Sequence, residues 1–533
     1  MTSDAEPPSR QTEQPQTPGH VFVIHGRLQD VAHDAVIVPT ETSFGVRSGW
    51  TAVTGVTRPA PPEGWTDNGF GVMVEPSAGN VWFLDVTDED QVASPDLVTG
   101  RVSRLLEAIT SSLREPWTTP TRRRAQHLVA LPLLGSGGGG IPSAAMVSEL
   151  LKTLETSTRD LRVDVAVVVP QRSRFNALQW HRRRHLTTSM DDLARSLGAR
   201  ARDGELALMI GAGVSAGAGL PDWAELIKQV AGRAKGDDMR ALLESPEFAR
   251  LPMLDQAELI QRILGEATRD EIVDAVSKVP SDGTDGQAQA PRPALSHFLL
   301  AGLRCQEVAT TNYDLLYEDA VRSQAQDGAG HGDIAVLPYD SLKPGHPWIL
   351  KLHGDAKHRE DIVLSRSSFV DYDGARQAVG SLFQAMLMTR HVLFVGLSFT
   401  DDNVLRLTHH VTKVRPSEVF GTALALHSDA ARERLWQDQL RWVSMEVPDD
   451  VSDAQVDRAP GTSDRRTAWQ ARSLEVFLDR VAMWAVSEEE VLLDLEVSGQ
   501  DNPLDLTPGQ LRAAENGRRW LAHVRHIRAA DGR

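Results

Sequence analysis

Residues 206–223 read LALMIGAGVSAGAGLPDW, an apolar run followed by a glycine-rich turn and the start of a helical pattern. This order predicts a buried strand, a tight turn and a helix. Gly211, Gly213 and Ala216 fit the G-x-G-x-x-A form of a dinucleotide-binding turn, whose backbone N–H groups and helix N-terminus hold a pyrophosphate. A glycine-rich turn between a strand and a helix is also common in proteins where it serves only the packing of the two elements and binds no ligand. No acidic residue ends a second strand about 20 residues on, so the pattern does not support an ordinary dehydrogenase.

Three more segments follow in the chain. They read TTNYD at 310–314, KLHGD at 351–355 and VGLSF at 395–399. Together with the glycine turn, these segments resemble the sirtuin (silent information regulator) family, in the same order, over about residues 190–485. The resemblance implies an α/β fold with a Rossmann-like parallel sheet and an NAD site.

The resemblance also implies individual roles. Asn312 and Asp314 match positions that line the nicotinamide-ribose pocket, and His353 matches the general base, so these three are the predicted catalytic residues. Breaking the N-glycosidic bond builds positive charge on the ribose, which a carboxylate and a histidine base can stabilise. The residues implied for binding NAD+ are Gly211, Ala212, Gly213, Ser215, Asp222, Thr311, Gly396 and Ser398.

Each of these residues also has a structural interpretation. A single His-Gly pair after an apolar strand, as at His353, is more often structural, and Asn312 followed by Asp314 is typical of a turn. The order of the four segments favours the functional interpretation of all three.

Two departures from the family narrow the chemistry. Cys305 is the only cysteine, so the four-cysteine zinc module of sirtuin deacylases cannot form, and we expect no metal. The TTNYD segment also differs from the TQNID form typical of deacylases. Zinc-less sirtuin-like domains of bacterial anti-phage systems share both departures, and they hydrolyse NAD to ADP-ribose and nicotinamide. The resemblance thus implies an NAD-depleting hydrolase that uses water as acceptor. The alternatives are a non-catalytic NAD or ADP-ribose sensor, a deacylase and an ADP-ribosyltransferase.

The N-terminal part resembles a macro domain over residues 19–178. Apolar runs at 21–24, 35–38, 128–134 and 163–169 predict its strands. The resemblance implies a nucleotide sensor in which Gly135, Ser136, Gly137 and Gly138 cradle a diphosphate. Arg27 and Thr40 depart from the family at the adenine and distal-ribose positions, and a ligand-free glycine loop is the alternative.

Composition limits the partners. The 533 residues include 56 basic and 73 acidic ones, a net charge of −17, which argues against nucleic acid and anionic membranes as main partners. No apolar run of about 18 residues predicts a membrane span, so we expect a cytoplasmic protein.

The expected partners are NAD, an ADP-ribose-derived signal or phage component, and further copies of the chain. The expected parts are a disordered leader (1–18), a macro-like domain (19–178), a linker (179–200), a sirtuin-like domain (201–485) and an acidic, helical tail (486–533).

Overall fold

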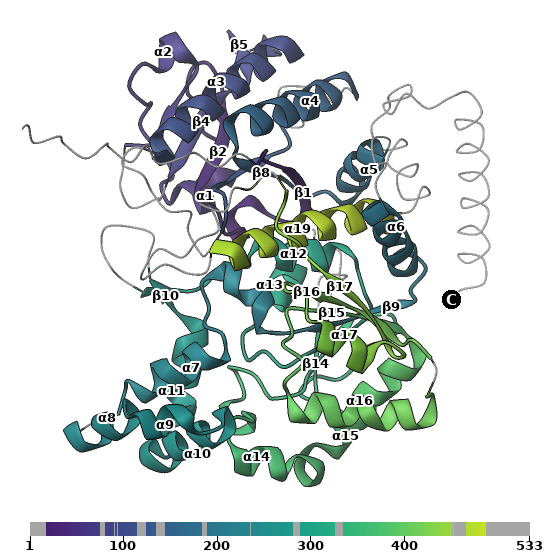
Figure 1. The fold of residues 1–533 in the computed structure, drawn as a ribbon. Helices are drawn as coiled ribbons and strands as arrows, with labels where there is room; N and C mark the ends of the chain where they lie inside the picture. The colour runs from purple at the N-terminus through teal and green to yellow at the C-terminus, as the bar shows by residue number, and fades with distance from the viewer. Residues whose placement is uncertain are drawn as a thin grey trace, which may run out of the picture.

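The structure, a computed structural model, describes residues 17–74, 80–89, 91–92, 94–114, 124–134, 144–183, 189–234, 236–280, 288–325, 334–416, 418–449, 451 and 465–486. Two β-sheets, built mainly from parallel strands, lie on either side of a shared layer of helices (Figure 1). The predicted α/β class is therefore confirmed. Residues 1–16 of the expected leader and 487–533 of the expected tail lie outside the described residues.

The first sheet belongs to the N-terminal part and has the strand order β1-β8-β7-β2-β4-β3. Only β3 runs antiparallel to its neighbour. The apolar runs expected to form strands all do so, because their β-branched residues are buried on both faces of the sheet. The strands are β1 (Val21–His25), β2 (Ala35–Thr40), β3 (Phe70–Val72), β4 (Val81–Asp85), β7 (Leu128–Pro132) and β8 (Asp164–Val169).

The two faces of this sheet are covered by different parts of the chain. Alternate residues such as Val21 and Val23 pack against α3 (Pro95–Arg114) and α4 (Ala144–Leu161). The residues between them point to the opposite face, as the period-2 geometry of a strand requires. That second face is covered by helices from the C-terminal part.

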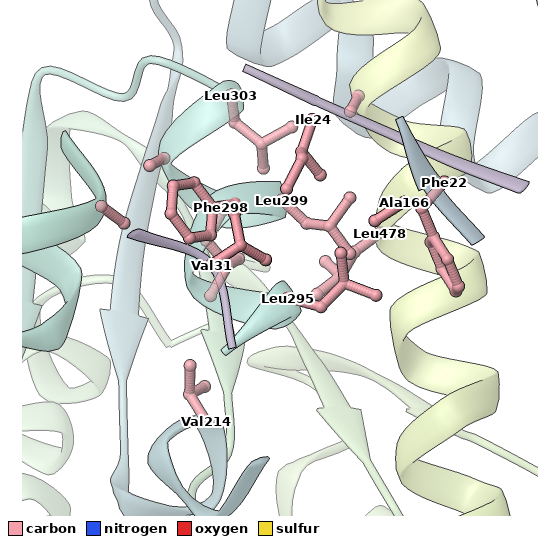
Figure 2. Close-up of a cluster of buried hydrophobic side chains, with 14 of the residues drawn as sticks. Phe22, Ile24, Val31, Ala166, Val214, Leu295, Phe298, Leu299, Leu303 and Leu478 are labelled. Carbon is pink, nitrogen blue, oxygen red and sulfur yellow. The ribbon is translucent and has the colours of Figure 1, made fainter. Parts of the chain in front are cut away.

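These covering helices are α12 (Leu295–Gly302) and α19 (Arg465–Ala485). Figure 2 shows Phe22 and Ile24 of β1 beside side chains of both helices, including Phe298. The contact is close: a Cβ added at Gly26 would lie 2.6 Å from the Phe298 ring. The same cluster continues into the second sheet, so one hydrophobic core spans both sheets.

Helix α19 also carries charged side chains into this interface. Arg472 Nη2 lies 2.8 Å from Asp164 Oδ1, and Arg182 Nη2 lies 2.6 Å from Asp479 Oδ2. All four side chains are buried. Such pairs hold the interface in one arrangement, because separating them would leave buried charges unpaired. The pairs between α19 and earlier parts of the chain include Arg472–Asp164, Asp479–Arg182 and Glu475–Arg124.

The expected linker at 179–200 lies largely in two helices, α5 (Arg172–Arg182) and α6 (Ser189–Arg202), both in contact with α19. Within this expected linker, Arg182 is not solvated but buried against Asp479. The expected leader also ends earlier than residue 18, since Thr17 is buried and its carbonyl accepts a hydrogen bond from Gln126.

The second sheet has the order β13-β14-β12-β9-β15-β16-β17, and all of its strands are parallel. One face packs on the shared helices and the other on α15 (Tyr372–Thr389) and α16 (Asp402–Val414). Residues 206–210 form the central strand, as the sequence predicts. The strands are β9 (Leu206–Ile210), β12 (Glu307–Thr310), β13 (Ala335–Leu337), β14 (Trp348–Lys351), β15 (His391–Val395), β16 (Gly421–Ala425) and β17 (Leu440–Ser444).

A small helical unit with its own apolar core follows the glycine turn and lies beside the second sheet (Figure 1). It consists of α7 (Trp223–Ala231), α8 (Asp237–Leu243), α9 (Pro246–Arg250), α10 (Met253–Leu264) and α11 (Ala267–Ser277). No helix in the described ranges is both long and apolar enough to cross a bilayer. The other short α-helices are α1 (Thr51–Thr54), α2 (Trp65–Asn68), α13 (Leu316–Ser323), α14 (Arg366–Val370) and α17 (Ala430–Trp436). Two short antiparallel strand pairs are also present, β5 (Thr87–Asp88) with β6 (Gln91–Val92) and β10 (Val279–Pro280) with β11 (Ala288–Gln289).

Candidate active site

The four predicted segments meet at one edge of the second sheet. The register pairs Ile210 of β9 with Thr310 of β12 on one side and with Val395 of β15 on the other, and it pairs Thr310 with Lys351 of β14. Because the strands are parallel, the chain leaves all four of these positions at the carboxyl edge. The strand order reverses between β9 and β15, and α/β sheets bind ligands at such a switch point.

Two glycine loops touch at this edge. Gly211 N donates to Val395 O at 2.9 Å, and Gly213 N donates to Gly396 O at 3.0 Å. A Cβ at Gly211 would lie 2.5 Å from Gly396 O. Gly396 has a φ of +72°, and a Cβ there would lie 2.7 Å from Val214 N. Glycine is therefore required at both positions for the loops to approach so closely.

Gly396→Ala tests this contact. Left-handed strain and the clash with backbone atoms together are expected to lower the free energy of unfolding by about 3 kcal/mol. The measurement is urea unfolding, with Gly374→Ala in α15 as the control, because a Cβ at Gly374 meets nothing within 4 Å. Equal stability of the two variants would show that the loops are not held together as described.

A cleft of about 1470 Å³ opens at this edge, larger than the 300–1,000 Å³ typical of small-ligand pockets. It extends beyond the second sheet to Arg124 of the N-terminal part and Glu475 of α19. Every residue predicted for the site lines it, namely Gly211, Ala212, Gly213, Ser215, Asp222, Thr311, Asn312, Asp314, His353, Gly396 and Ser398.

Some of these residues lie at the rim. Asp222 is exposed and caps α7, where its carboxylate accepts a hydrogen bond from Glu225 N at 2.9 Å. Ser398 is also exposed, and its hydroxyl lies 2.6 Å from that of Thr400. Thr311 is half-buried, with its N–H directed to Ile210 O at 3.4 Å. These three side chains lie at the opening of the cleft, where a bound ligand could contact them.

Asn312 lies deeper and is held by its amide nitrogen. Nδ2 donates to Gly211 O at 3.2 Å and to Ser215 Oγ at 3.1 Å. Ser215 in turn donates to Asp314 Oδ2 at 2.8 Å. The Asn312 Oδ1 atom is buried and meets no hydrogen-bond donor within the described part of the chain. A buried amide oxygen without a partner is costly, so it favours a ligand donor at this point.

A buried ion pair between Lys351 and Glu318 holds the backbone of Asp314 in place. Lys351 Nζ donates to Asp314 O at 2.7 Å and lies 2.7 Å from Glu318 Oε1. Asp314 Oδ1 accepts from Leu316 N at 3.1 Å. Both carboxylate oxygens of Asp314 thus have protein donors, so Asp314 orients Ser215 in this structure.

His353 is 1% exposed and follows β14, the neighbour of the strand β12 that Asn312 follows. Burial lowers the pKa of His353, Asp401 opposes this effect, and Arg376 adds to it. The imidazole is therefore neutral at pH 7. Its Nε2 atom has no hydrogen-bond partner among the described residues, and the nearest carboxylate oxygen, Asp401 Oδ2, lies 3.5 Å away. A neutral imidazole placed in this way can accept a proton, and Asp401 can stabilise the resulting charge.

Sequence reasoning missed three residues of this site. Asp401 follows the VGLSF segment and also caps α16, and Arg432 lines the far end of the cleft. His297 lies beneath the cleft, with its Nε2 atom 3.3 Å from Ser215 Oγ. A single histidine in the otherwise apolar helix α12 was the available signal for it.

The predicted N-terminal ligand loop, Gly135, Ser136, Gly137 and Gly138, lies outside the described residues. Arg27, the predicted departure from the macro-domain pattern, is described. Its N–H donates to Ser323 Oγ of α13 at 2.9 Å, and its guanidinium pairs with Asp30. The first loop of the N-terminal sheet therefore lies against α13.

Across the described ranges, no group of three or more histidine, cysteine or acidic side chains has the geometry of a metal site.

Comparison with known proteins identifies part of the chain. Residues 306–441 match the model of the SIR2-like domain. The chain is 31% identical over 114 residues to the NAD(+) hydrolase ThsA of Enterococcus faecium, which covers 21% of this chain and 23% of that protein. It is 29% identical over 109 residues to the NAD(+) hydrolase ThsA of Bacillus cereus (20% and 23%) and 25% identical over 122 residues to the Defense-associated sirtuin 2 of Bacillus subtilis (22% and 12%). The matches thus span about a quarter or less of each relative's length.

The matched range begins after the glycine turn at 211–219, yet the strand register places that turn directly between Asn312 and Gly396. The switch-point cleft, the two touching glycine loops and the buried Asn312 and His353 belong to one structural unit. Residues 306–441 of this unit are similar to a SIR2-like domain.

Proposed function

We propose that the chain is an NAD+ hydrolase that releases nicotinamide and ADP-ribose. The observation that carries this proposal is a pair of buried polar atoms, Asn312 Oδ1 and His353 Nε2. Both residues follow neighbouring strands and line the same cleft, and the two atoms have no hydrogen-bond partner in the described chain. An amide oxygen and a neutral imidazole at a nucleotide-sized cleft suit a reaction that must hold a water molecule and remove its proton.

In the proposed reaction, the bond between ribose C1′ and the nicotinamide nitrogen breaks, and its electron pair goes to the pyridinium ring. The ribose becomes an oxocarbenium-like cation. Water adds to C1′ and loses its proton, so NAD+ and water give nicotinamide, ADP-ribose and one proton. Asn312 Oδ1 accepts a hydrogen bond from the attacking water, and His353 Nε2 takes up the proton near the Asp401 carboxylate.

The glycine loops supply the nucleotide-binding part of the proposal. The glycine turn lines the cleft at Ala212 and Ala216 and suits the pyrophosphate of NAD there, while the Gly213 N–H holds the turn to Gly396 O. Arg432 also lines the cleft, where it pairs with Asp429 and donates to Ser398 O, so it fixes the loop at Gly396 and Ser398 that the proposal places under the adenosine half. The names of the relatives, two NAD(+) hydrolases and one defence-associated sirtuin, agree with this substrate and with a role in anti-phage defence by NAD depletion.

We further propose that residues 19–178 form a macro-like sensor domain that regulates residues 201–485. Helix α12 supports such coupling, because its Phe298 packs at Gly26 of the N-terminal domain while the preceding residue, His297, contacts Ser215. The ligand proposed for the sensor is an ADP-ribose-derived nucleotide, and assembly into a homo-oligomer remains a prediction.

Nicotinamide release tests the function. Purified full-length protein is incubated with NAD, with and without ADP-ribose-type nucleotides, and the products are separated by chromatography. His353→Ala is expected to lower turnover by roughly 100-fold or more, since it removes the proton acceptor. His409→Ala, on the exposed side of α16, is the control. Equal turnover by His353→Ala and wild type would remove His353 from the mechanism, and binding of NAD without turnover in every condition would indicate a non-catalytic sensor.

A further inference from the structure

His297 occupies a position in which both of its ring nitrogens are used. It is the third residue of α12 and is 1% exposed. Its Nδ1 atom accepts a hydrogen bond from Ala294 N at 3.1 Å. Burial lowers the pKa of His297 to about 4, against an opposing effect of Asp314, so the ring carries one proton at pH 7. Because Nδ1 is an acceptor, that proton lies on Nε2.

The proton on Nε2 determines the direction of the next hydrogen bond. Nε2 lies 3.3 Å from Ser215 Oγ, which must therefore accept from His297. The serine hydroxyl has one proton of its own, and it is directed to Asp314 Oδ2 at 2.8 Å. Two donors, His297 and Asn312, then occupy the lone pairs of Ser215 Oγ. All three partners of this hydroxyl are buried.

This arrangement requires the same orientation of the Asn312 amide as the Gly211 carbonyl, which can only accept from Nδ2. Ser215 Oγ has no second proton to donate, so the Asn312 atom facing it must be the NH2 group. The amide oxygen then points away from Ser215 and is the atom left without a partner.

We propose that His297 is a positioning residue that acts through Ser215 to hold the Asn312 amide with its oxygen directed at the reacting water. This inference rests on the proposed hydrolase function and extends it to a residue that does not touch the substrate. A residue in this role is expected to change turnover more than substrate affinity.

Two substitutions separate this role from a purely structural one. His297→Asn places an amide where Nδ1 was, so it keeps the acceptor for Ala294 N and loses the donor to Ser215. His297→Gln places an amide where Nε2 was, so it keeps a donor to Ser215 and loses the acceptor for Ala294. If His297 positions Asn312, His297→Asn is expected to lower kcat for nicotinamide release by roughly 10- to 100-fold with KM changed less than threefold. His297→Gln is expected to stay within about threefold of wild type in kcat.

The matched control is His391→Asn. His391 is also a neutral, partly buried histidine bound to a hydroxyl, with Nε2 2.9 Å from Thr422 Oγ1, but it lies at the opposite, amino-terminal edge of the same sheet. It is expected to leave kcat unchanged. Thermal unfolding of all variants shows whether each one folds. A loss of kcat in His297→Gln as large as in His297→Asn, or no loss in either variant, would overturn the proposal.

A second measurement on the wild-type chain does not depend on activity. The 15N signals of the histidine rings, with that of His297 assigned by its disappearance in His297→Gln, report which nitrogen carries the proton. A protonated Nε2 at pH 7 supports the positioning role, and a protonated Nδ1 overturns it. If the wild type bound NAD but released no nicotinamide, the proposed function would fail, and this tautomer measurement would still show whether His297 donates to Ser215 as the positioning role requires.

Discussion

Asn312→Ala is expected to lower kcat/KM for NAD hydrolysis by roughly 100- to 1,000-fold, the range found when one preorganised polar group is removed from an active site. The Asn312 amide binds the glycine turn at Gly211 and Ser215 through Nδ2 and leaves Oδ1 for the reacting water. Alanine removes both functions. The measurement is steady-state nicotinamide release, and thermal unfolding shows how much of the loss is structural.

Asn312→Asp makes the same test with a side chain of equal size. A carboxylate would face the Gly211 carbonyl and lie close to Asp314, so it would lose both donated hydrogen bonds and add a like charge. We expect a loss of activity at least as large as that of Asn312→Ala. Activity close to wild type in either variant would show that the Asn312 amide takes no part in turnover.

Asp479→Ala is expected to produce the largest change in stability. The Asp479 carboxylate accepts from Arg182 at 2.6 and 2.9 Å, lies 2.8 Å from His20 Nε2, and is completely buried. Its removal leaves the buried guanidinium of Arg182 without a counter-ion, which costs about 3–5 kcal/mol. Urea unfolding of the full chain measures the effect.

Two further variants identify the cause. The double substitution Arg182→Met, Asp479→Leu is expected to recover much of the loss, because apolar side chains need no counter-ion. Asp192→Ala breaks an exposed pair with Arg195 on α6 and is expected to change stability by less than about 1 kcal/mol. If Asp479→Ala were as mild as Asp192→Ala, the buried pair would not stabilise the interface.

The same carboxylate predicts a pH dependence. Burial raises the pKa of Asp479, but Arg182 and His20 outweigh this effect and bring it from its ordinary value of 3.8 down to about 2. A lowered pKa in the folded state means that the stabilisation is complete above about pH 4 and is lost as the pH falls toward 2. Wild-type stability should therefore decline over this range more steeply than that of the Arg182→Met, Asp479→Leu variant.

The sequence predicted those parts of the fold whose signals are local. The strand at 206–210 is continuous in hydrophobicity and bounded by a glycine turn, and β9 has the same bounds. The ordered segments around Asn312 and His353 predicted residues that all line one cleft, because parallel strands bring their carboxyl ends together.

What the sequence could not predict depends on contacts between distant residues. His297 is 82 residues from Ser215, and nothing next to it in the chain shows that the two side chains meet. Arg182 stands in a basic stretch that favours solvent exposure, and only its contact with Asp479, 297 residues away, explains its burial. The buried partners of α19 follow from tertiary packing rather than from propensity.

The shared helical layer has a consequence for how such a chain could diversify. If recombination replaced the N-terminal part, the new part would have to pack against α12 and α19. The apolar and charged side chains of these two helices are complementary to those of β1, β8 and α5. A replacement domain without an acid at position 164 and a base at position 182 would leave Arg472 and Asp479 buried and unpaired. The two halves are therefore expected to change by paired substitutions across the interface, and exchange of the N-terminal part would require α19 to change with it.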